Sequence, residues 1–455
     1  MRMKILLGLA VAWLSSEIVS AATDKVVCYH GTWSRYRNGN GQFTVSDIDP
    51  TLCTHIIYSF VGINTDGTIN LLDRALDITN GNFANFVSLK KRNSKVKTLV
   101  AVGGWNEGSL KYSNVAASSS LRANFIQSAL NLVQTYKFDG FDLDWEYPGQ
   151  RGGAAADIVS VAEISYLDII NVMAYDFHGS WDGVTGQNAP LYASSIETGS
   201  TRLLNVDAAI RGWIQRGADP QKIALGLGVY GRSYTLSSSS NTALGAPVSG
   251  AGNQGPYTGE SGMLGYNEIC ELQRGGGWTT VWDEQQKVPY TYKGNQWVGY
   301  DNPKSIAIKV NYAKSLNLGG VMIWSIETED FRGICGPKYP LLNAIRSALG
   351  TLGESNDDDT ANEPPAEEPP AQEPPAEESP AEEPPADDGT APADGGSTDL
   401  CTKAGYVRDP LNCNIFYYCL PVGTSYVPLK QQCNSGLYFD EAAQTCNWPQ
   451  LVSGC

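Results

Sequence analysis

Residues 138–148 read FDGFDLDWEYP, and this stretch decides the fold that we predict for the region around it. Acidic and large apolar residues alternate along it, which is the period of a β-strand, so the acidic side chains share one face. These acidic residues are Asp142, Asp144 and Glu146. Neighbouring carboxylates in partial burial resist joint ionisation, and one of them then stays protonated near neutral pH, as a general acid must. The stretch therefore predicts a strand that carries catalytic carboxylates.

Two other interpretations of the acidic strand are a calcium-binding loop and a solvated acidic face. Calcium loops place their ligands along Gly-containing turns rather than between bulky aromatic residues, so we favour catalysis. Histidine is too scarce for a His-rich metal site or a His-based catalytic triad, because the chain has only His30, His55 and His178. We expect neither a metal nor a cofactor.

Apolar segments alternate with amphipathic ones on both sides of this stretch. The apolar segments are nearly continuous, as is typical of parallel strands that are covered on both faces. The predicted strands are residues 26–30, 55–63, 98–104, 138–146, 169–177, 223–231 and 320–327. The predicted helices are residues 83–92, 121–136, 206–216, 306–316 and 341–349. The alternation predicts an α/β fold, a (β/α)8 TIM barrel, with an active site at the carboxyl ends of its strands. Residues 235–305, rich in Gly, Tyr and Trp, are too long for a barrel loop and predict an inserted α+β subdomain.

The chain begins with MRMKILLGLAVAWLSS, a basic start followed by an apolar run, and small residues come next. This pattern is typical of a secretory signal peptide, which we place at residues 1–22. No later stretch is long and apolar enough to cross a bilayer, so we expect a secreted, extracellular protein without membrane contact. Secretion favours disulfides among the ten cysteines.

The net charge of −16 is concentrated in one segment. Residues 354–398 contain fifteen Asp or Glu and no Lys or Arg, and the remainder is nearly neutral. This distribution excludes the basic surface that nucleic-acid binding requires. Repeated EPPAE-like units, with their prolines and like charges, favour an extended chain. We therefore predict a Pro/Glu-rich linker at residues 351–398, between a large module at 23–350 and a small one at 399–455.

The small module contains six of the ten cysteines. A module this short needs disulfides to be stable, so we predict a small disulfide-rich β domain. The spacing alone does not determine which cysteines pair. The six are Cys401, Cys413, Cys419, Cys433, Cys446 and Cys455.

FDGFDLDWEYP resembles the DGxDxDxE signature of glycoside hydrolase family 18, and the large module is similar to an animal, insect-type chitinase. Further matching motifs cover nearly the whole module in the family's order. They are CYHGTW (28–33), VGGWNEGS (102–109), NVMAYDFHGSW (171–181), GLGVYGRSY (226–234) and GGVMIWSIETEDF (319–331). In the small module, the spacing of the cysteines with FYYC, GLYFDE and CNWP resembles the type-2, or peritrophin-A, chitin-binding domain.

The resemblance implies an endochitinase that hydrolyses β-1,4-linked N-acetylglucosamine polymers by a retaining, substrate-assisted mechanism. Glu146 would be the general acid and then the general base. Asp144 would hydrogen-bond the acetamido N–H of the substrate, and Asp142 would share a proton with Asp144. Tyr175 would hold the acetamido oxygen. The partners would be chitin and chito-oligosaccharides, bound by a monomer.

The resemblance also implies binding residues and disulfides. Trp324 would form the floor under the cleaved sugar, although any single aromatic residue of this kind can instead be a core residue. The proposed substrate-binding residues are Tyr29, Phe60, Trp105, Met173, Asp176, Trp181, Tyr230, Arg232 and Trp324. In the small module, the candidates that face chitin are Tyr418, Tyr438 and Trp448. The implied disulfides are Cys28–Cys53, Cys270–Cys335 and Cys433–Cys446.

The large module departs from the family at one place. A barrel uses roughly 30 residues for each strand and helix. The predicted strands that begin at residues 138 and 169 are therefore consecutive by spacing, yet by motif they are the fourth and sixth strands of the family. We predict that one helix–strand unit is missing after residue 153.

Three explanations for the missing unit stay open. The chain is a splice form or has a gap in its gene model, or the barrel closes with seven strands, with residues 157–162 as a substitute strand, or the product is inactive. Two other functions also stay open, a non-catalytic chitin-binding lectin and a structural protein of a chitin matrix.

Overall fold

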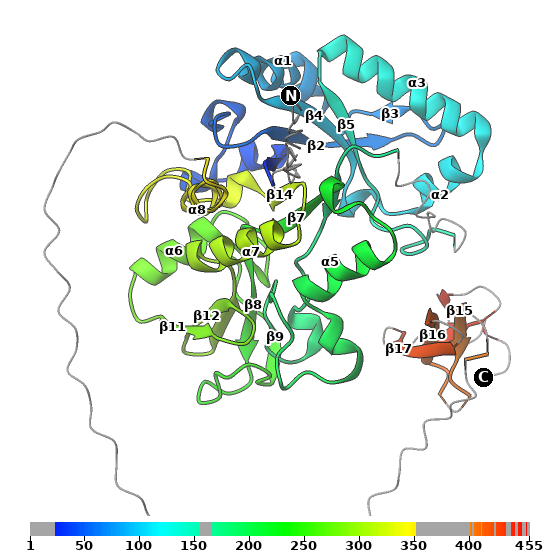
Figure 1. Ribbon diagram of the computed structural model, residues 1–455, viewed down its shortest axis with the longest axis vertical. Coiled ribbons are helices and arrows are strands. Elements are labelled where there is room, and N and C mark those ends of the chain that lie inside the picture. Colours follow the sequence, from blue (N-terminus) through cyan, green and yellow to red (C-terminus); the bar gives the residue numbers. More distant parts are fainter. Residues whose placement is uncertain are drawn as a thin grey trace, which may run out of the picture. The chain divides into compact units, whose positions relative to one another are not determined.

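The structure is a computed structural model, and it describes residues 23–154, 166–351, 401–402, 405–410, 412–422, 425–433, 438–441, 445–447 and 452 (Figure 1). The predicted signal peptide and nearly all of the predicted linker lie outside these residues. The chain divides into two compact units, Met1–Gly353 and Glu354–Cys455, and each is treated by itself. Within the described ranges, no helix combines the length and the apolar character needed to cross a membrane.

A curled parallel sheet forms the centre of the first unit. Its strands are β1 (Lys25–Gly31), β2 (His55–Ile63), β4 (Lys97–Gly103), β5 (Gly140–Asp144), β6 (Ile170–Val172), β7 (Ile223–Gly228) and β14 (Gly320–Trp324). Their order across the sheet is β5-β4-β2-β1-β14-β7-β6, and every neighbouring pair is parallel. The short strand β3 (Ile69–Asn70) pairs with β2 antiparallel. The predicted parallel α/β architecture is confirmed.

Helices pack on the outer face of the sheet, where the largest apolar cluster lies. They are α1 (Asn82–Val87), α2 (Leu110–Ala117), α3 (Ser119–Tyr136), α5 (Val206–Gln215), α7 (Pro303–Ser315) and α8 (Pro340–Leu349). Shorter helical turns connect them, namely η1 (Thr32–Tyr36), η2 (Gly39–Gly41), η3 (Val45–Asp47), η4 (Ala75–Thr79), η5 (Ser88–Lys91), η6 (Trp105–Glu107), η8 (Ser180–Asp182), η9 (Gly199–Leu203), η10 (Pro220–Lys222) and η11 (Ile326–Thr328). A smaller cluster of aromatic and aliphatic side chains fills the concave inner face.

The sheet is open between β5 and β6, where the sequence predicts a missing unit. These two strands are the ends of the sheet, and among the described residues neither has a partner on its outer side. The sheet is therefore a curled half-barrel rather than a closed (β/α)8 barrel. Closure with seven strands is not found in the described residues, and the candidate substitute strand at 157–162 lies outside them.

Four predicted strands are longer than the observed ones. The strands predicted at 138–146, 169–177, 223–231 and 320–327 end at Asp144, Val172, Gly228 and Trp324. The strand predicted at 169–177 ends at Val172, where it has β7 as its one neighbour. Beyond it, Asp176 has a φ of 57°, which turns the chain out of the extended conformation. The strand predicted at 138–146 ends at Asp144, so Glu146 stands just past the end of β5.

The predicted insert is a second, antiparallel sheet with one helix (Figure 1). Its elements are β8 (Tyr230–Leu236), β9 (Val248–Ala251), β10 (Met263–Gly265), α6 (Tyr266–Arg274), β11 (Thr279–Asp283), β12 (Val288–Lys293) and β13 (Gln296–Gly299). The insert begins at β8, which follows β7 directly, and so starts earlier than the predicted residue 235. Arg232 and Tyr230 consequently belong to the first strand of the insert.

The second unit contains short antiparallel strands, as predicted for a small β domain. They are β15 (Gly405–Arg408), β16 (Ile415–Val422), β17 (Ser425–Gln432), β18 (Tyr438–Asp440) and β19 (Thr445–Asn447). A disulfide joins Cys401 to Cys419, and the rings of Phe416 and Phe439 stack 4.1 Å apart. Aromatic stacking and a disulfide thus replace the large apolar core that so short a segment cannot form.

Candidate active site

The three carboxylates lie at the carboxyl end of β5, on the concave face of the sheet. Asp142 and Asp144 are opposite Ala101 and Gly103 of β4. Gly103 has a φ of 124°, and a Cβ at this position would collide with the main-chain oxygen of Asp144. A glycine is therefore required for β4 and β5 to approach so closely next to the carboxylates.

Asp142 is the carboxylate with the most hydrogen bonds. The hydroxyl of Tyr29 donates to its Oδ2 at 2.9 Å, and the amide of Asn171 donates to its Oδ1 at 3.3 Å. Burial raises the pKa of Asp142 to about 6, and these two hydrogen bonds oppose the rise. Tyr29 and Asn171 thus each bind one oxygen of Asp142. The proton sharing between Asp142 and Asp144 that the resemblance implies stays a prediction.

Asp144 and Glu146 both have raised pKa values. Burial, and then the charges of Glu146 and Asp142, raise the pKa of Asp144 well above its ordinary value. Burial also raises the pKa of Glu146, whereas a hydrogen bond from Tyr147 and the charge of Arg151 lower it. The raised pKa values show that three negative charges together are disfavoured in this row, and this arrangement can keep one carboxyl protonated for general acid catalysis.

A second group of polar side chains faces the carboxylates from the β6 and β8 side. Asp176 accepts a hydrogen bond from the Tyr230 hydroxyl at 2.6 Å and another from the Arg232 Nε at 2.7 Å. The main-chain N–H of Asp176 donates to Asn188 Oδ1 at 3.0 Å. This hydrogen bond stabilises the left-handed backbone conformation of Asp176. Tyr175 is buried, and burial followed by the charge of Asp144 raises the pKa of its hydroxyl. The arrangement offers donors and acceptors suited to sugar hydroxyl and amide groups.

Aromatic rings form one wall of the site. The rings of Trp324 and Phe60 are stacked 5.8 Å apart, and Tyr29 lies 5.4 Å from Trp324. Trp33 lies 6.1 Å from both Phe60 and Trp324, with its indole 42% exposed. Sequence reasoning missed Trp33 as a site residue, although it is the last residue of the CYHGTW motif. Flat, partly exposed rings of this kind suit the C–H faces of sugars.

Three other predicted binding residues are exposed rather than buried in the core. They are Trp105, Trp181 and Met173, at 59%, 60% and 37% exposure. The guanidinium of Arg232 lies 5.2 Å from the ring of Trp181, and that of Arg151 lies 3.6 Å from the ring of Trp105. Arg151 and Asn171 were not predicted from the sequence. Asn171 opens the motif NVMAYDFHGSW, so its position in that motif was the available signal.

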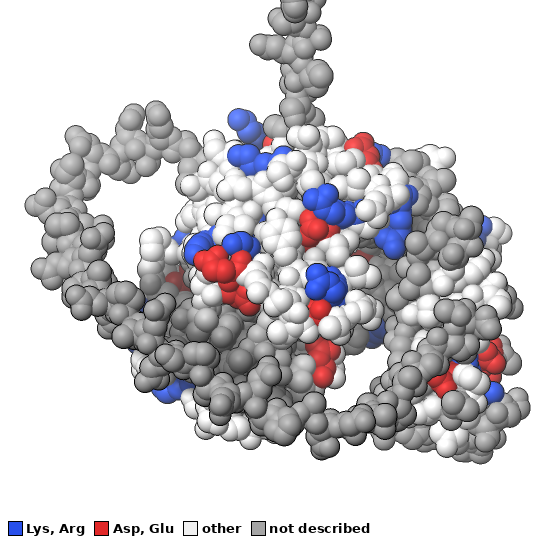
Figure 2. Space-filling model, turned by 60° about the horizontal axis from the view of Figure 1, so that its bottom comes forward, with Lys and Arg blue, Asp and Glu red and all other residues white. Residues whose placement is uncertain are grey.

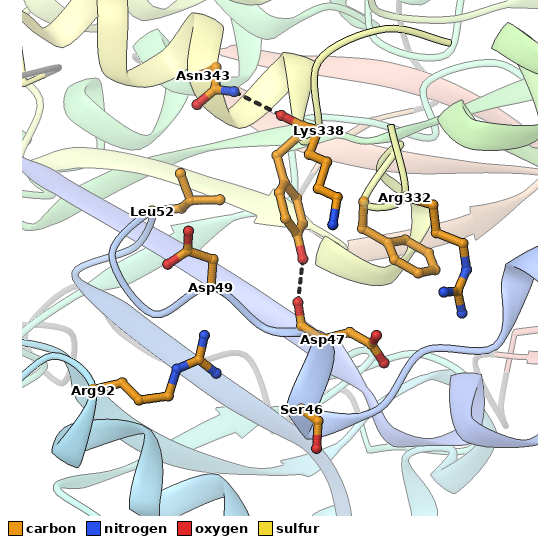
Figure 3. A pocket seen from close by; sticks show the side chains of 10 residues that line it. Ser46, Asp47, Asp49, Leu52, Arg92, Arg332, Lys338 and Asn343 are labelled. Carbon is orange, nitrogen blue, oxygen red and sulfur yellow. Dashed lines mark hydrogen bonds between the residues drawn. The ribbon is translucent and has the colours of Figure 1, made fainter. Parts of the chain in front are cut away.

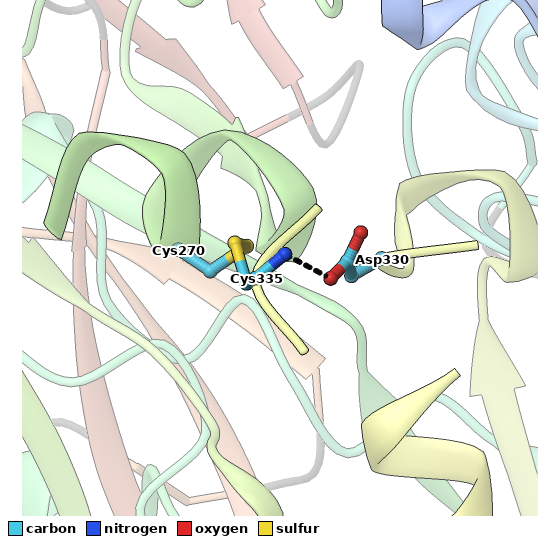
Figure 4. A group of neighbouring side chains, drawn as sticks. All are labelled: Cys270, Asp330 and Cys335. Atoms are coloured by element: carbon cyan, nitrogen blue, oxygen red, sulfur yellow. Dashed lines mark hydrogen bonds between the residues drawn. A yellow bond between two sulfur atoms is a disulfide. The ribbon is translucent and has the colours of Figure 1, made fainter. Parts of the chain in front are cut away.

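The disulfides of the large module are Cys28–Cys53 and Cys270–Cys335, the two pairings implied for it by the resemblance. Cys270, Asp330 and Cys335 cluster as metal ligands can (Figure 4). Their sulfurs are bonded to each other, and Asp330 accepts hydrogen bonds from the main-chain N–H groups of Ile334 and Cys335 at 2.8 and 2.7 Å. The cluster is therefore a structural link, because a disulfide leaves no thiolate to bind a metal.

A separate hollow of about 540 Å³ lies between η3 and the start of α8. Figure 3 shows Lys338 and Arg92 pointing toward it, and a hydrogen bond from the Tyr339 hydroxyl to the main-chain oxygen of Asp47 crosses it. None of the residues that line it is a predicted site residue. On the face of the described residues in Figure 2, basic and acidic side chains are interspersed rather than separated by sign.

The candidates of the small module are described only in part. Tyr438 is a partly exposed residue of β18. Tyr418 belongs to β16, but its side chain is outside the described part of the structure, as are Trp448 and the side chain of Cys446. The predicted pair Cys433–Cys446 therefore also lies outside it.

Comparisons with known proteins agree with the geometry of the site. Residues 25–163 and 152–329 match the family "Glycosyl hydrolases family 18", and residues 401–455 match "Chitin binding Peritrophin-A domain". The chain is 38% identical to an endochitinase of Manduca sexta over 75% of this chain and 70% of that protein.

Solved structures resemble the large module as well. A Group IV chitinase of Ostrinia furnacalis in complex with allosamidin is 44% identical, with a TM-score of 0.69, over 72% of this chain and 98% of that chain. Human YKL-39, described as a pseudo-chitinase with retained chitooligosaccharide binding, is 37% identical, with a TM-score of 0.66, over 72% of this chain and 99% of that chain.

The comparisons also locate the gap in the sheet. The two family matches overlap at residues 152–163, where the prediction places the missing unit. The Manduca sexta alignment has 391 positions, of which this chain fills roughly 340, so the gaps exceed the ~30 residues of one strand and helix. The gaps together are long enough to hold one such unit.

Proposed function

Because the chain belongs to glycoside hydrolase family 18, we propose that its half-barrel binds chains of β-1,4-linked N-acetylglucosamine and hydrolyses them. The observation that carries this proposal is the row Asp142, Asp144 and Glu146 at the end of β5, partly buried and with raised pKa values. The aromatic wall at Trp324 supports it, since sugar rings stack on such faces.

The reaction follows the retaining, substrate-assisted route. Protonated Glu146 gives its proton to the glycosidic oxygen as the bond to the anomeric carbon breaks. The acetamido oxygen of the same sugar attacks that carbon and forms an oxazolinium ion. Glu146, now a carboxylate, takes a proton from water, which attacks the anomeric carbon and restores the acetamido group with net retention.

The neighbours of Glu146 serve the acetamido group and the sugar rings. Asp144 accepts the acetamido N–H and offsets its developing positive charge, and Tyr175 donates to the acetamido oxygen. Asp142 holds Tyr29 and Asn171 in place behind Asp144. The remaining binding residues, proposed from the resemblance and from their exposure or stacking, are Phe60, Trp33, Trp105, Met173, Asp176, Trp181, Tyr230, Arg232 and Trp324.

We propose the same module boundaries as the sequence indicates, with a signal peptide at 1–22, a catalytic module at 23–350, a linker at 351–398 and a chitin-binding domain at 399–455. The product is secreted, acts as a monomer and has no membrane partner. Tyr418, Tyr438 and Trp448 are the proposed contacts with chitin. A binding domain on the same chain raises the effective concentration of insoluble substrate for the catalytic module.

A second candidate function is binding of chito-oligosaccharides without hydrolysis. The open edge of the sheet favours it, because β5 carries the carboxylates and is an end strand without a partner on one side. The retention of Glu146 favours the enzyme.

The experiment that separates the two compares the full chain with Glu146→Gln. We expect hydrolysis of a fluorogenic chito-oligosaccharide to fall by at least about 100-fold in the variant, because the general acid is lost. Binding of allosamidin, measured by calorimetry, should persist in both proteins, and binding of chitopentaose should persist in the variant, which does not consume it. Equal rates of hydrolysis in the two proteins would show that Glu146 is not the general acid. If the unmodified chain binds the ligands but does not hydrolyse the substrate, the second candidate function is favoured.

A further inference from the structure

Arg151 makes two contacts that bear on substrate binding. It lies in the turn that follows Glu146, beside the open edge of the sheet. Its Nη1 donates a hydrogen bond to the main-chain oxygen of Glu146 at 3.0 Å. Its guanidinium carbon lies 3.6 Å from the ring centroid of Trp105. Arg151 therefore touches both the backbone of the proposed acid and an indole proposed to bind a sugar.

The turn that carries Arg151 is attached to α2 at both ends. Ser109, the residue before α2, donates through its hydroxyl to the main-chain oxygen of Tyr147 at 2.8 Å. The main-chain N–H of Ala154 donates to the hydroxyl of Ser113 at 3.0 Å. Arg151 itself has a φ of 50°, a left-handed conformation that residues other than glycine adopt rarely. The main chain that carries Arg151 is thus held against α2, and the contacts of the exposed side chain with Glu146 and Trp105 start from this turn.

The guanidinium and a sugar ring compete for the same surface. A pyranose stacks its C–H face on an indole, and Trp105 is 59% exposed with Arg151 over one of its faces. A cation over an indole at an exposed site is held by a weak attraction, so a sugar can displace it at a modest cost in affinity. The hydrogen bond to the oxygen of Glu146 adds to this cost, since it is broken when the side chain moves.

We propose that Arg151 limits the affinity of the site for its substrate, because it covers a face of Trp105 and has to be displaced by the sugar that stacks there. This inference rests on the proposed function, because it assumes that the site binds N-acetylglucosamine chains. Arg151 thus opposes the binding of a sugar at Trp105, although Arg151 itself contacts the main chain of the proposed general acid Glu146.

The test is a double-mutant cycle with chitopentaose as the probe. The full chain carries Glu146→Gln throughout, so that the probe is not consumed, and its dissociation constant is measured by calorimetry. Arg151→Ala should tighten binding by about two- to fivefold when Trp105 is present. In a Trp105→Ala background the same change should have no effect, because the covered surface is gone. Arg274→Ala, which removes an exposed arginine at the end of α6, is the control for loss of charge and should leave binding unchanged.

The outcomes separate this inference from the proposed function. If Arg151→Ala leaves the affinity for chitopentaose unchanged or weakens it, the inference alone is overturned. The inference is also overturned if Arg151→Ala tightens binding by the same factor in the Trp105→Ala background as it does when Trp105 is present. If no version binds chitopentaose, both the inference and the proposed function are overturned.

Discussion

Asp144 has the least favourable surroundings for a negative charge among the three carboxylates of the site. It is partly buried next to Asp142 and Glu146, and their charges add to the effect of burial on its pKa. Asp142 accepts hydrogen bonds from Tyr29 and Asn171, and Glu146 is close to the positive charge of Arg151. The surroundings therefore shift the pKa values of chemically similar residues through different causes, and such differences allow the residues to have different roles.

The raised pKa of Asp142 leads to a prediction about stability. Because its pKa is about 6 in the folded state and near 3.8 when unfolded, the folded state binds more protons between these values. The contribution of Asp142 to stability is therefore present at low pH and is lost as the pH rises from about 4 to about 6. Asp142→Asn keeps the shape of the side chain without its charge. The free energy of unfolding of this variant, relative to that of the wild type, should therefore rise by up to about 3 kcal/mol as the pH increases over this range.

Urea unfolding of both proteins between pH 4 and pH 7 measures this difference. A gap between the two proteins that stays constant over the range would contradict the pKa of Asp142 given above. Asp66→Asn is a suitable control, because the pKa of this exposed residue is lowered, chiefly by hydrogen bonds from Thr68, rather than raised.

At the residue scale, alternation along FDGFDLDWEYP was enough to place Asp142 and Asp144 on the inner face of a strand. It could not show that Tyr29 and Asn171 would hold Asp142, because these contacts join β1 and β6 to β5 across long stretches of sequence. Arg151 was missed for a different reason. Its contact with Trp105 depends on the left-handed turn after β5, which no periodic pattern reports.

At the scale of elements, the open edge of β5 is the main departure from a closed barrel. Leu143 points to the outer face, where Phe141 and Trp145 pack against the core, yet Leu143 is 55% exposed. On α3, Ile126 and Leu130 are also exposed. In a closed barrel the next helix and strand would cover an outward residue at this position. The missing unit was predictable because motif order and residue spacing disagree, whereas the exposure of particular side chains was not.

This exposure predicts unequal costs for two neighbouring substitutions. Leu143 of β5 is opposite Val102 of β4, and Val102 is fully buried in the same outer layer. Val102→Ala should lower the free energy of unfolding by about 2 kcal/mol, since it removes buried methyl groups and leaves a cavity. Leu143→Ala should cost less than about 1 kcal/mol, because little apolar surface is buried there. Urea unfolding measures both, and a larger cost at Leu143 than at Val102 would show that the edge is covered in solution.

At the scale of the whole molecule, composition alone separated the two folded modules. The run of prolines and acids at residues 354–398 has no apolar residue larger than alanine to form a core, so the boundary was visible without any structural information. The β topology of the small module was predictable only as a class, because cysteine spacing does not determine pairing. Cys401–Cys419 is a disulfide that the sequence did not specify.

The two modules predict different responses to removal of residues 399–455. Turnover of a soluble chito-oligosaccharide should be unchanged within about twofold, because the carboxylates and the aromatic wall lie in the large module. The last proposed substrate-binding residue along that module is Trp324, well before the deleted segment. Retention on chitin beads should fall by about 100-fold or more, since the tethered binding domain supplies avidity without contacting the cleaved bond. The matched control is the full chain with Tyr438→Ala, which should lose part of the retention and none of the soluble activity. Retention that survives the deletion would place chitin binding in the large module, and the small module would then need another role.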